Sequence, residues 1–231
     1  MDWETFWAQP PEYFSNPFMR RERVEYLRDC LIGEGGVLPG SSLLDYGCGD
    51  SDLAPLLVEA GVKVFLYDRS PAYRAKAEQC AARTPNVQVV DEDFLRDRDG
   101  VTIDTILVCA VIQYLDDNEL YRLLTLLRQR LARGGRLLVV DVPDHSSGFR
   151  DAIERLSDAW RYGYFLRALA NIMRRLVRGF GGDLKFHRYS TEEMLDLLTR
   201  HGLDAMRAAG NFTPMRSRHT YIATGCDNAG R

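Results

Sequence analysis

The sequence has few cysteines, and their spacing is typical neither of disulfide bonds nor of a metal site. Its five cysteines are scattered, odd in number and without a C-x-x-C pair, so neither a disulfide framework nor a zinc site is expected. No run of 18 uncharged apolar residues occurs, so we expect no transmembrane segment. The N-terminus, M-D-W-E-T-F-W, carries acids where a signal peptide has basic residues. These absences predict a cytoplasmic protein without a metal.

The sequence also lacks an excess of basic residues. It has 30 Lys and Arg against 33 Asp and Glu, a net charge of −3. A general nucleic-acid binder needs a basic face, so no nucleic-acid partner is expected. The 231 residues, 45% hydrophobic and 27% charged, fit one globular domain with an extension.

Strand and helix patterns alternate from residue 42 onward. The expected strands are Ser42–Asp45, Val62–Tyr67, Val87–Val90, Thr105–Cys109 and Arg136–Val142, with two more near Asp204–Ala208 and Thr220–Thr224. The expected helices are about Pro17–Ile32, Asp52–Ala60, Pro71–Arg83, Asn118–Ala132, which Gly134 and Gly135 would stop, and Ser190–His201. Nearly continuous apolar strands between helices predict a parallel sheet buried on both faces. Ligands of such sheets bind beyond the carboxyl ends of the strands.

Two segments fall outside this alternation. We divide the chain into an aromatic and helical cap, residues 1–40, and a domain, residues 41–231, with a helical insertion at about 146–186. Apolar residues and arginines alternate at helical spacing within the insertion, which indicates an amphipathic basic helix. It could be a lid over a substrate, a helix packed on the core or on a second copy in a homodimer, or a membrane-surface element.

The stretch L-L-D-Y-G-C-G-D-S-D-L, residues 43–53, is a glycine turn after an apolar strand. A dinucleotide fold needs a third glycine, which is missing here, and Asp50 and Asp52 would repel a pyrophosphate. A nicotinamide oxidoreductase is therefore disfavoured. Asp45, two residues before Gly47, suits a ligand that carries positive charge.

The pattern D-x-G-x-G resembles motif I of the class I S-adenosylmethionine (SAM) dependent methyltransferases. Five further segments are similar to the family's motifs, in the same order: Y-D-R-S-P (67–71), N-V-Q-V-V-D-E-D-F (86–94), D-T-I-L-V-C-A-V-I-Q-Y-L (104–115), L-A-R-G-G-R-L-L-V-V-D-V (131–142) and R-Y-S-T-E-E-M-L-D-L-L-T-R-H-G-L (188–203). The resemblance covers most of the chain. It implies a doubly wound, mostly parallel seven-stranded α/β sheet with strand order 3-2-1-4-5-7-6 and helices on both faces. Ser51 departs from the family, which often has glycine there.

The resemblance also implies which residues bind SAM. Asp68 would accept both ribose hydroxyls, Asp93 would accept from the adenine amino group, and Phe94 would lie near the adenine ring. Tyr13 is placed like an N-terminal tyrosine that contacts SAM in many relatives with small substrates. The full set of expected cofactor-binding residues is Tyr13, Asp45, Gly47, Gly49, Asp68, Arg69, Asp93, Phe94 and Cys109. The product of the reaction would be S-adenosylhomocysteine (SAH).

The methyl acceptor is less well determined. No N-P-P-Y follows the fourth strand, and no Pro-Cys offers a nucleophile for cytosine C5. Candidate bases are His145, His187 and His219, because a histidine can take a hydroxyl proton near neutral pH. Candidate acceptor-binding residues are Gln113, Tyr114, Arg216 and Arg218.

We expect methyl transfer to oxygen, and in second place to nitrogen, of a small molecule such as a secondary metabolite, a sugar or a lipid-linked intermediate. Two alternatives stay open. One is a protein that binds SAM or SAH without methyl transfer, and the other is an RNA or protein methyltransferase.

Overall fold

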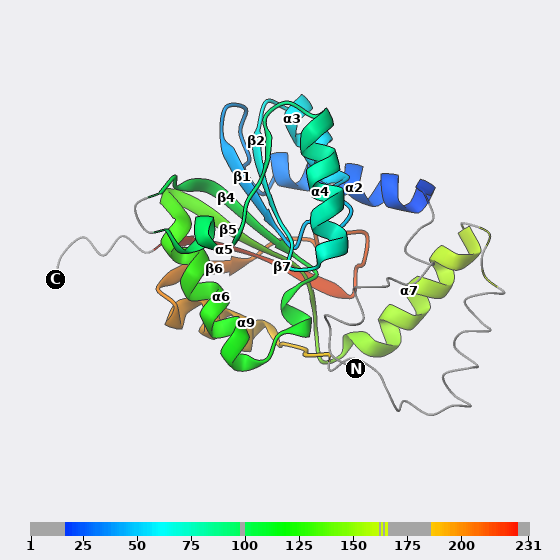
Figure 1. Ribbon diagram of the computed structural model, residues 1–231. Coiled ribbons are helices and arrows are strands. Elements are labelled where there is room, and N and C mark those ends of the chain that lie inside the picture. Colours follow the sequence, from blue (N-terminus) through cyan, green and yellow to red (C-terminus); the bar gives the residue numbers. More distant parts are fainter. Residues whose placement is uncertain (1–16, 98–99, 162, 164, 166–185, 226–231) are drawn as a thin grey trace.

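The structure, a computed structural model, describes residues 17–97, 100–161, 163, 165 and 186–225. Its centre is a seven-stranded sheet in the order β3-β2-β1-β4-β5-β7-β6 (Figure 1). The strands are β1 (Ser42–Tyr46), β2 (Lys63–Tyr67), β3 (Val87–Val89), β4 (Ile103–Cys109), β5 (Leu131–Pro143), β6 (Leu203–Arg207) and β7 (Arg218–Gly225). The first five pair in parallel, and β7 is antiparallel to both of its neighbours. The predicted fold class and strand order are confirmed.

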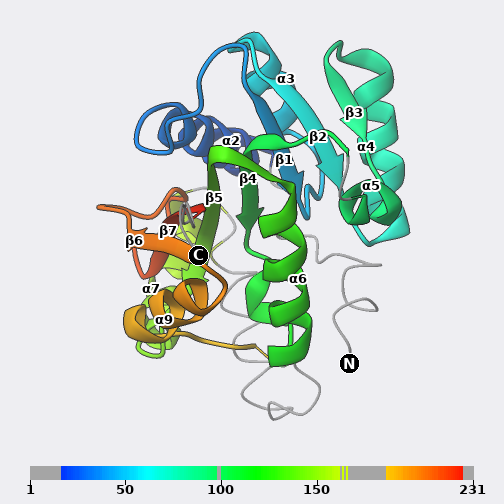
Figure 2. The same cartoon turned by 90° about the vertical axis from the view of Figure 1, so that its left-hand side faces the viewer.

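Helices cover both faces of the sheet (Figure 2). On one face lie α2 (Pro17–Ile32), α3 (Leu53–Glu59) and α4 (Pro71–Arg83). On the other lie α5 (Glu92–Arg96), α6 (Asp117–Arg130) and α9 (Thr191–Arg200). Successive strand residues point to opposite faces, so Leu43 joins the first core cluster and Leu44 joins the second. This two-sided burial explains why the strands are apolar throughout.

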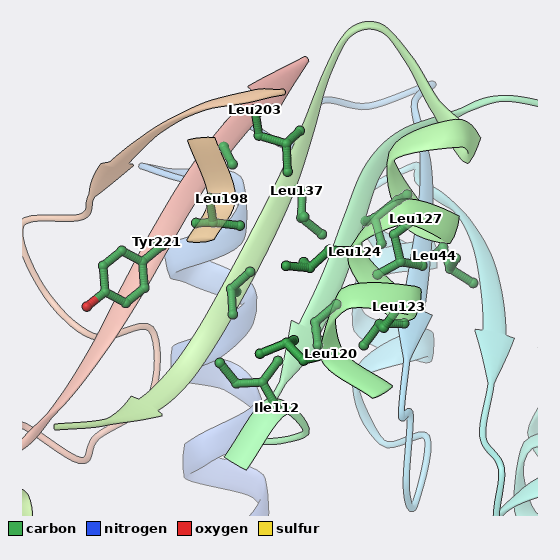
Figure 3. Packing of buried hydrophobic residues seen from close by; sticks show 14 of the residues in the cluster. Leu44, Ile112, Leu120, Leu123, Leu124, Leu127, Leu137, Leu198, Leu203 and Tyr221 are labelled. Carbon is green, nitrogen blue, oxygen red and sulfur yellow. The ribbon is translucent and has the colours of Figure 1, made fainter. Parts of the chain in front are cut away.

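Helix α6 shows how the sequence specifies an element. Asp116 accepts the backbone N–H of Glu119, and the Glu119 carboxylate accepts that of Asp116, a capping box that fixes the helix start. From there Leu120, Leu123, Leu124 and Leu127 point toward the sheet (Figure 3). The same device, Ser190 with Glu193, begins α9, a helix that the sequence predicted from Ser190.

The end of α6 differs from the prediction. The helix ends at Arg130 and β5 begins at Leu131, so Gly134 and Gly135 lie inside a strand rather than after a helix. Leu131 pairs with Ile103 of β4, and the register shifts between Ile103 and Thr105. Strand pairing, a tertiary interaction, overrides the local helix pattern here.

Three elements that the sequence did not predict each follow a strand of the sheet. They are α5, the 3₁₀ turn η2 (Ile112–Tyr114) and α7 (Ser147–Arg161). Helix α7 lies within the predicted insertion, and most of the predicted basic helix lies outside the described residues. Helix α2 buries Leu31 in the same cluster as Leu43, and the division of the chain at residue 40 stays a prediction. Among the helices in the described ranges, none is long and apolar enough to cross a membrane.

Leu127 tests the packing of α6 on the sheet, because its side chain is fully buried. Leu127→Ala is expected to lower the free energy of unfolding by ~2–5 kcal/mol, through lost burial and a cavity. The matched control is Gln129→Ala, exposed on the same helix and expected to change it by less than ~0.5 kcal/mol. Denaturant unfolding measures both, and equal effects would contradict the packing described here.

Candidate functional site

The glycine turn after β1 lies against the end of β2. The Gly47 N–H donates to the Tyr67 carbonyl at 2.8 Å, and the Gly49 N–H donates to Asp68 Oδ2 at 3.0 Å. Both glycines have left-handed φ angles, +83° and +52°. A Cβ on Gly47 would lie 2.5 Å from Val111 Cγ2, whereas one on Gly49 would meet nothing within 4 Å. Gly47 is thus required by packing, and Gly49 borders open space.

Two carboxyl groups stand beside this turn with raised pKa values. Asp45 is buried, and burial, with a smaller contribution from the charge of Asp68, raises its pKa to about 7. Burial also raises the pKa of Asp68, opposed by hydrogen bonds from the N–H groups of Ser70 and Gly49. A cation bound beside them would stabilise the charged form of both groups.

Asp50 and Asp52 do not face a ligand as free charges. Asp50 lies 2.5 Å from Lys76 Nζ and 3.3 Å from Arg20 Nη2, and Asp52 accepts from Arg20 Nε at 3.0 Å. These pairs screen both acids, so the repulsion of a pyrophosphate expected from them is weaker than the sequence suggested. The charge beside the turn comes from Asp45 and Asp68.

Backbone strain gathers at the carboxyl edge of the sheet. Ser51 after β1, Ala110 after β4 and Asp141 near the end of β5 have φ angles of +60°, +55° and +65°, and Asn86, before β3, has a φ angle of +62°. Such conformations cost of order 1–3 kcal/mol each for residues other than glycine and concentrate at functional sites. A glycine at the position of Ser51 would adopt this angle without the cost that a serine has.

A cavity of about 280 Å³ opens beyond the ends of β2 and β3. Asp93 lines it and is exposed, as expected for a residue that meets a ligand. Asp91 caps α5 by accepting the N–H of Phe94 at 2.9 Å. The lining residues are Tyr67, Asp68, Arg69, Arg74, Asp91, Glu92 and Asp93. Arg74 is not among the residues expected from the sequence, because it lies one turn into α4 and carries no strand-end signal.

Phe94 follows Asp93 and packs against two side chains of the protein. Its ring stacks on Phe65, with centroids 5.4 Å apart, and the Arg130 guanidinium lies 4.5 Å from its centroid. The ring is partly buried between these two side chains, and its place near the adenine ring stays a prediction.

A second group of residues meets beyond β4 and β5. The His187 N–H donates to the Gln113 carbonyl at 2.8 Å, and the Tyr189 N–H donates to the Pro143 carbonyl at 3.0 Å. The Phe186 ring meets Tyr114 edge to face at 5.8 Å. The segment from Phe186 to Tyr189 thus crosses the ends of both strands and joins Gln113 and Tyr114, two candidate acceptor-binding residues.

The three candidate histidines have different surroundings. His145 is exposed, and its Nε2 lies 2.8 Å from Glu193. His219 is half-buried with Nε2 3.8 Å from Asp144, and burial and the charge of Arg207 lower its pKa. The backbone of His187 is fixed on Gln113. His219 is therefore neutral near pH 7, the form that accepts a proton.

The other described residues expected to form the site have separate surroundings and do not form one group. Burial raises the pKa of the Cys109 thiol well above its usual range, which argues against a thiolate nucleophile. Arg69 is exposed and lies 4.0 Å from Glu119, and Arg216 is exposed. Arg218 is buried between two carboxylates, so it does not present a free charge. Tyr13 lies outside the described residues.

No group of three or more His, Cys, Asp or Glu side chains among the described residues is arranged to hold a metal ion.

Comparison with known proteins decides the family. A family model described as a methyltransferase domain matches residues 19–207. The chain belongs to this family. An uncharacterized methyltransferase of Geobacillus kaustophilus is 28% identical over 196 residues, 81% of this chain and 83% of the relative.

Solved structures share the fold at low sequence identity. Magnesium protoporphyrin IX methyltransferase from Synechocystis, with bound SAH, is 18% identical with a TM-score of 0.60, covering 93% of this chain and 87% of the other. The N-methyltransferase NodS from Bradyrhizobium japonicum is 18% identical with a TM-score of 0.51, covering 91% and 96%. With the family match, the fold confirms the prediction of a class I SAM-dependent methyltransferase.

The carboxyl group of Asp45 predicts a pH dependence of stability. Its folded pKa of about 7 lies above the unfolded value, so the folded methyltransferase binds more protons between the two values and becomes less stable as pH rises through that window. Asp45→Asn removes this loss and is expected to be more stable than the wild type above pH 7, by up to ~4 kcal/mol. Thermal unfolding from pH 5 to pH 8 measures the difference, with exposed Asp204→Asn as the control. Parallel pH profiles of wild type and Asp45→Asn would contradict the raised pKa.

Proposed function

We propose that this methyltransferase moves the methyl group of SAM to a hydroxyl oxygen of a small molecule in the cytoplasm. The observation that carries the proposal is the joint placement of Asp45, the glycine turn and Asp68 at the carboxyl ends of β1 and β2. SAM supplies the methyl group on a positively charged sulfur when it is bound. The buried carboxyl of Asp45 would then gain a cationic neighbour.

The residues present fit this cofactor. Asp68 keeps lone pairs beyond those used by the Gly49 and Ser70 N–H groups, so it can accept two hydroxyl protons of a ribose. The open space at Gly49 lets a ligand approach the backbone, and the adjoining cavity has Asp93 at its rim for an amino group. The bound SAH of the magnesium protoporphyrin IX methyltransferase supports the same assignment. Arg69 and Cys109 stay predicted contacts.

A hydroxyl acceptor is favoured by the state of His219. As the carbon–oxygen bond forms and the carbon–sulfur bond breaks, the hydroxyl proton must leave, and a neutral imidazole can take it. Burial keeps His219 neutral, and Asp144 stands 3.8 Å from its Nε2 to stabilise the imidazolium that forms. The second candidate, an amine nitrogen acceptor, is favoured by the likeness to NodS, an N-methyltransferase.

The size and polarity of the acceptor follow from the residues beyond β4. Tyr114 and Phe186 offer aromatic surface and Gln113 a buried amide, which suits a partly apolar small molecule. A homodimer stays a prediction.

Cofactor binding is tested by calorimetric titration with SAM and SAH. Asp68→Asn is expected to weaken both by about tenfold to a hundredfold, because charge-assisted hydrogen bonds to the ribose are lost. Asp204→Asn is the matched control. Titration in two buffers of different ionisation enthalpy is expected to detect proton release from Asp45 near pH 7. Binding that is unchanged in Asp68→Asn would refute the ribose assignment.

The base is tested by substitution once a panel of hydroxyl and amine acceptors has given a substrate. His219→Gln is expected to lower kcat by about 10²–10⁴-fold with unchanged SAM affinity. The matched control is His201→Gln, in which the replaced ring caps the end of α9 away from the edge. Loss of activity in His187→Gln instead would assign the base to His187, and turnover on amines alone would reject the oxygen acceptor.

A further inference from the structure

A buried ion bridge joins three elements on the acceptor side of the site. Arg218, the first residue of β7, donates from Nη1 to Asp141 Oδ2 at 2.6 Å and from Nη2 to Asp151 Oδ2 at 3.1 Å. Asp141 lies near the end of β5 and Asp151 in the second turn of α7. The three side chains are 5%, 11% and 11% exposed, so solvent screens the bridge weakly.

Both ends of the bridge are held by further hydrogen bonds. Asp141 Oδ1 accepts from Thr213 Oγ1 at 2.6 Å and Asn211 Nδ2 at 3.3 Å. Asp151 Oδ1 accepts from Ser217 Oγ at 2.5 Å. One guanidinium thus serves two carboxylates, so its charge is compensated within the bridge.

The bridge contacts, through Phe186, the group of residues that meets beyond β4 and β5. The Phe186 ring centroid lies 5.6 Å from the Arg218 guanidinium, and Phe186 in turn packs edge to face on Tyr114. Ser147, one turn before Asp151, begins α7 shortly after β5 ends at Pro143.

In the part of the chain that the structure describes, buried polar atoms of η2, α7 and β7 lack a hydrogen-bond partner, among them Gln113 Oε1, Ser147 Oγ and Arg218 Nε. Their residues are 1%, 1% and 5% exposed. Buried polar atoms are nearly always paired in folded proteins, so these three call for a partner. They comprise one acceptor, one donor and one hydroxyl that can do either.

We propose that Arg218 is a positioning residue for the acceptor, which holds α7 against β5 and so fixes the wall formed by Gln113, Phe186 and Ser147. The group that this wall receives both donates and accepts hydrogen bonds, as a hydroxyl or amide does. This inference rests on the proposed function only for the identity of the bound group. The mechanical part, the attachment of α7 through Arg218, stands without it.

The first experiment needs no acceptor. Hydrogen exchange of the α7 peptide, residues 147–161, is compared with that of β1 in the wild type, Arg218→Met, Arg218→Lys, Asp151→Asn and Arg218→Met/Asp151→Asn. Losing a buried charge-assisted bond is expected to speed exchange in α7 by about tenfold or more, with β1 exchange and SAH affinity unchanged. Exchange in α7 of the double variant is expected to be no faster than in Arg218→Met, because both substitutions remove the same interaction. Arg218→Lys is expected to restore part of the protection. Arg200→Met is the matched control, since Arg200 forms an exposed ion pair with Asp196.

Unchanged exchange in α7, or additive effects of the two single substitutions, would overturn the attachment. If Arg218→Met fails to fold, Asp151→Asn gives the same comparison with little change in volume. Loss of SAH binding in parallel with faster exchange throughout the chain would overturn it too, because Arg218 would then support the whole fold.

The second experiment uses an acceptor found in the screen. Arg218→Lys is expected to raise the KM of the acceptor by about tenfold or more with the KM of SAM unchanged. An unchanged KM of the acceptor in Arg218→Lys would overturn the positioning role. Absence of turnover on every acceptor, with α7 exchange altered as expected, would count against the proposed function and leave the attachment standing.

Discussion

The parallel pairing of β1 with β2 and β4 is the constraint on which the rest of the structure depends. It brings Tyr46, Tyr67 and Val108 to the same level of the sheet, so the turns that follow these strands open at one edge. The pairing is held by burial on both faces, since Leu43 and Leu44 enter opposite core clusters. A change of register by one residue would exchange these faces and separate the glycine turn from Asp68.

Negative charge at the edge is handled in three ways. Asp50 and Asp52 are paired with Arg20 and Lys76 at the surface. Asp141 and Asp151 share Arg218 in the interior. Among the described residues, no cation lowers the pKa of Asp45. Burial raises that pKa and so favours the protonated form. A cationic ligand beside the glycine turn would therefore interact chiefly with Asp45 and Asp68, the acids that the other charges leave available.

The two halves of the site are built differently. The proposed cofactor half uses residues close in sequence to strand ends, and the hydrogen bond from Gly49 to Asp68 spans only 19 positions. The proposed acceptor half joins residues far apart in the chain, as in the contacts of Arg218 with Asp141 and Asp151, 77 and 67 positions away. Long-range contacts of this kind depend on how α7 and β7 dock on the sheet, so substitutions in these elements can change the acceptor while the cofactor half stays the same.

The sequence by itself determined the alternation of strands and helices, the glycine turn, the capping boxes of α6 and α9, and the strand-end position of Asp68. These features depend on local backbone preferences and apolar periodicity, which a short window contains. Only the tertiary structure decided where β5 begins, because Leu131 is drawn into pairing with Ile103. It also decided that Phe94 is held between Phe65 and Arg130, and that Arg218 is neutralised by two acids. The partners of these side chains lie far away in the chain, so the charge and exposure of each depend on packing that no local pattern records.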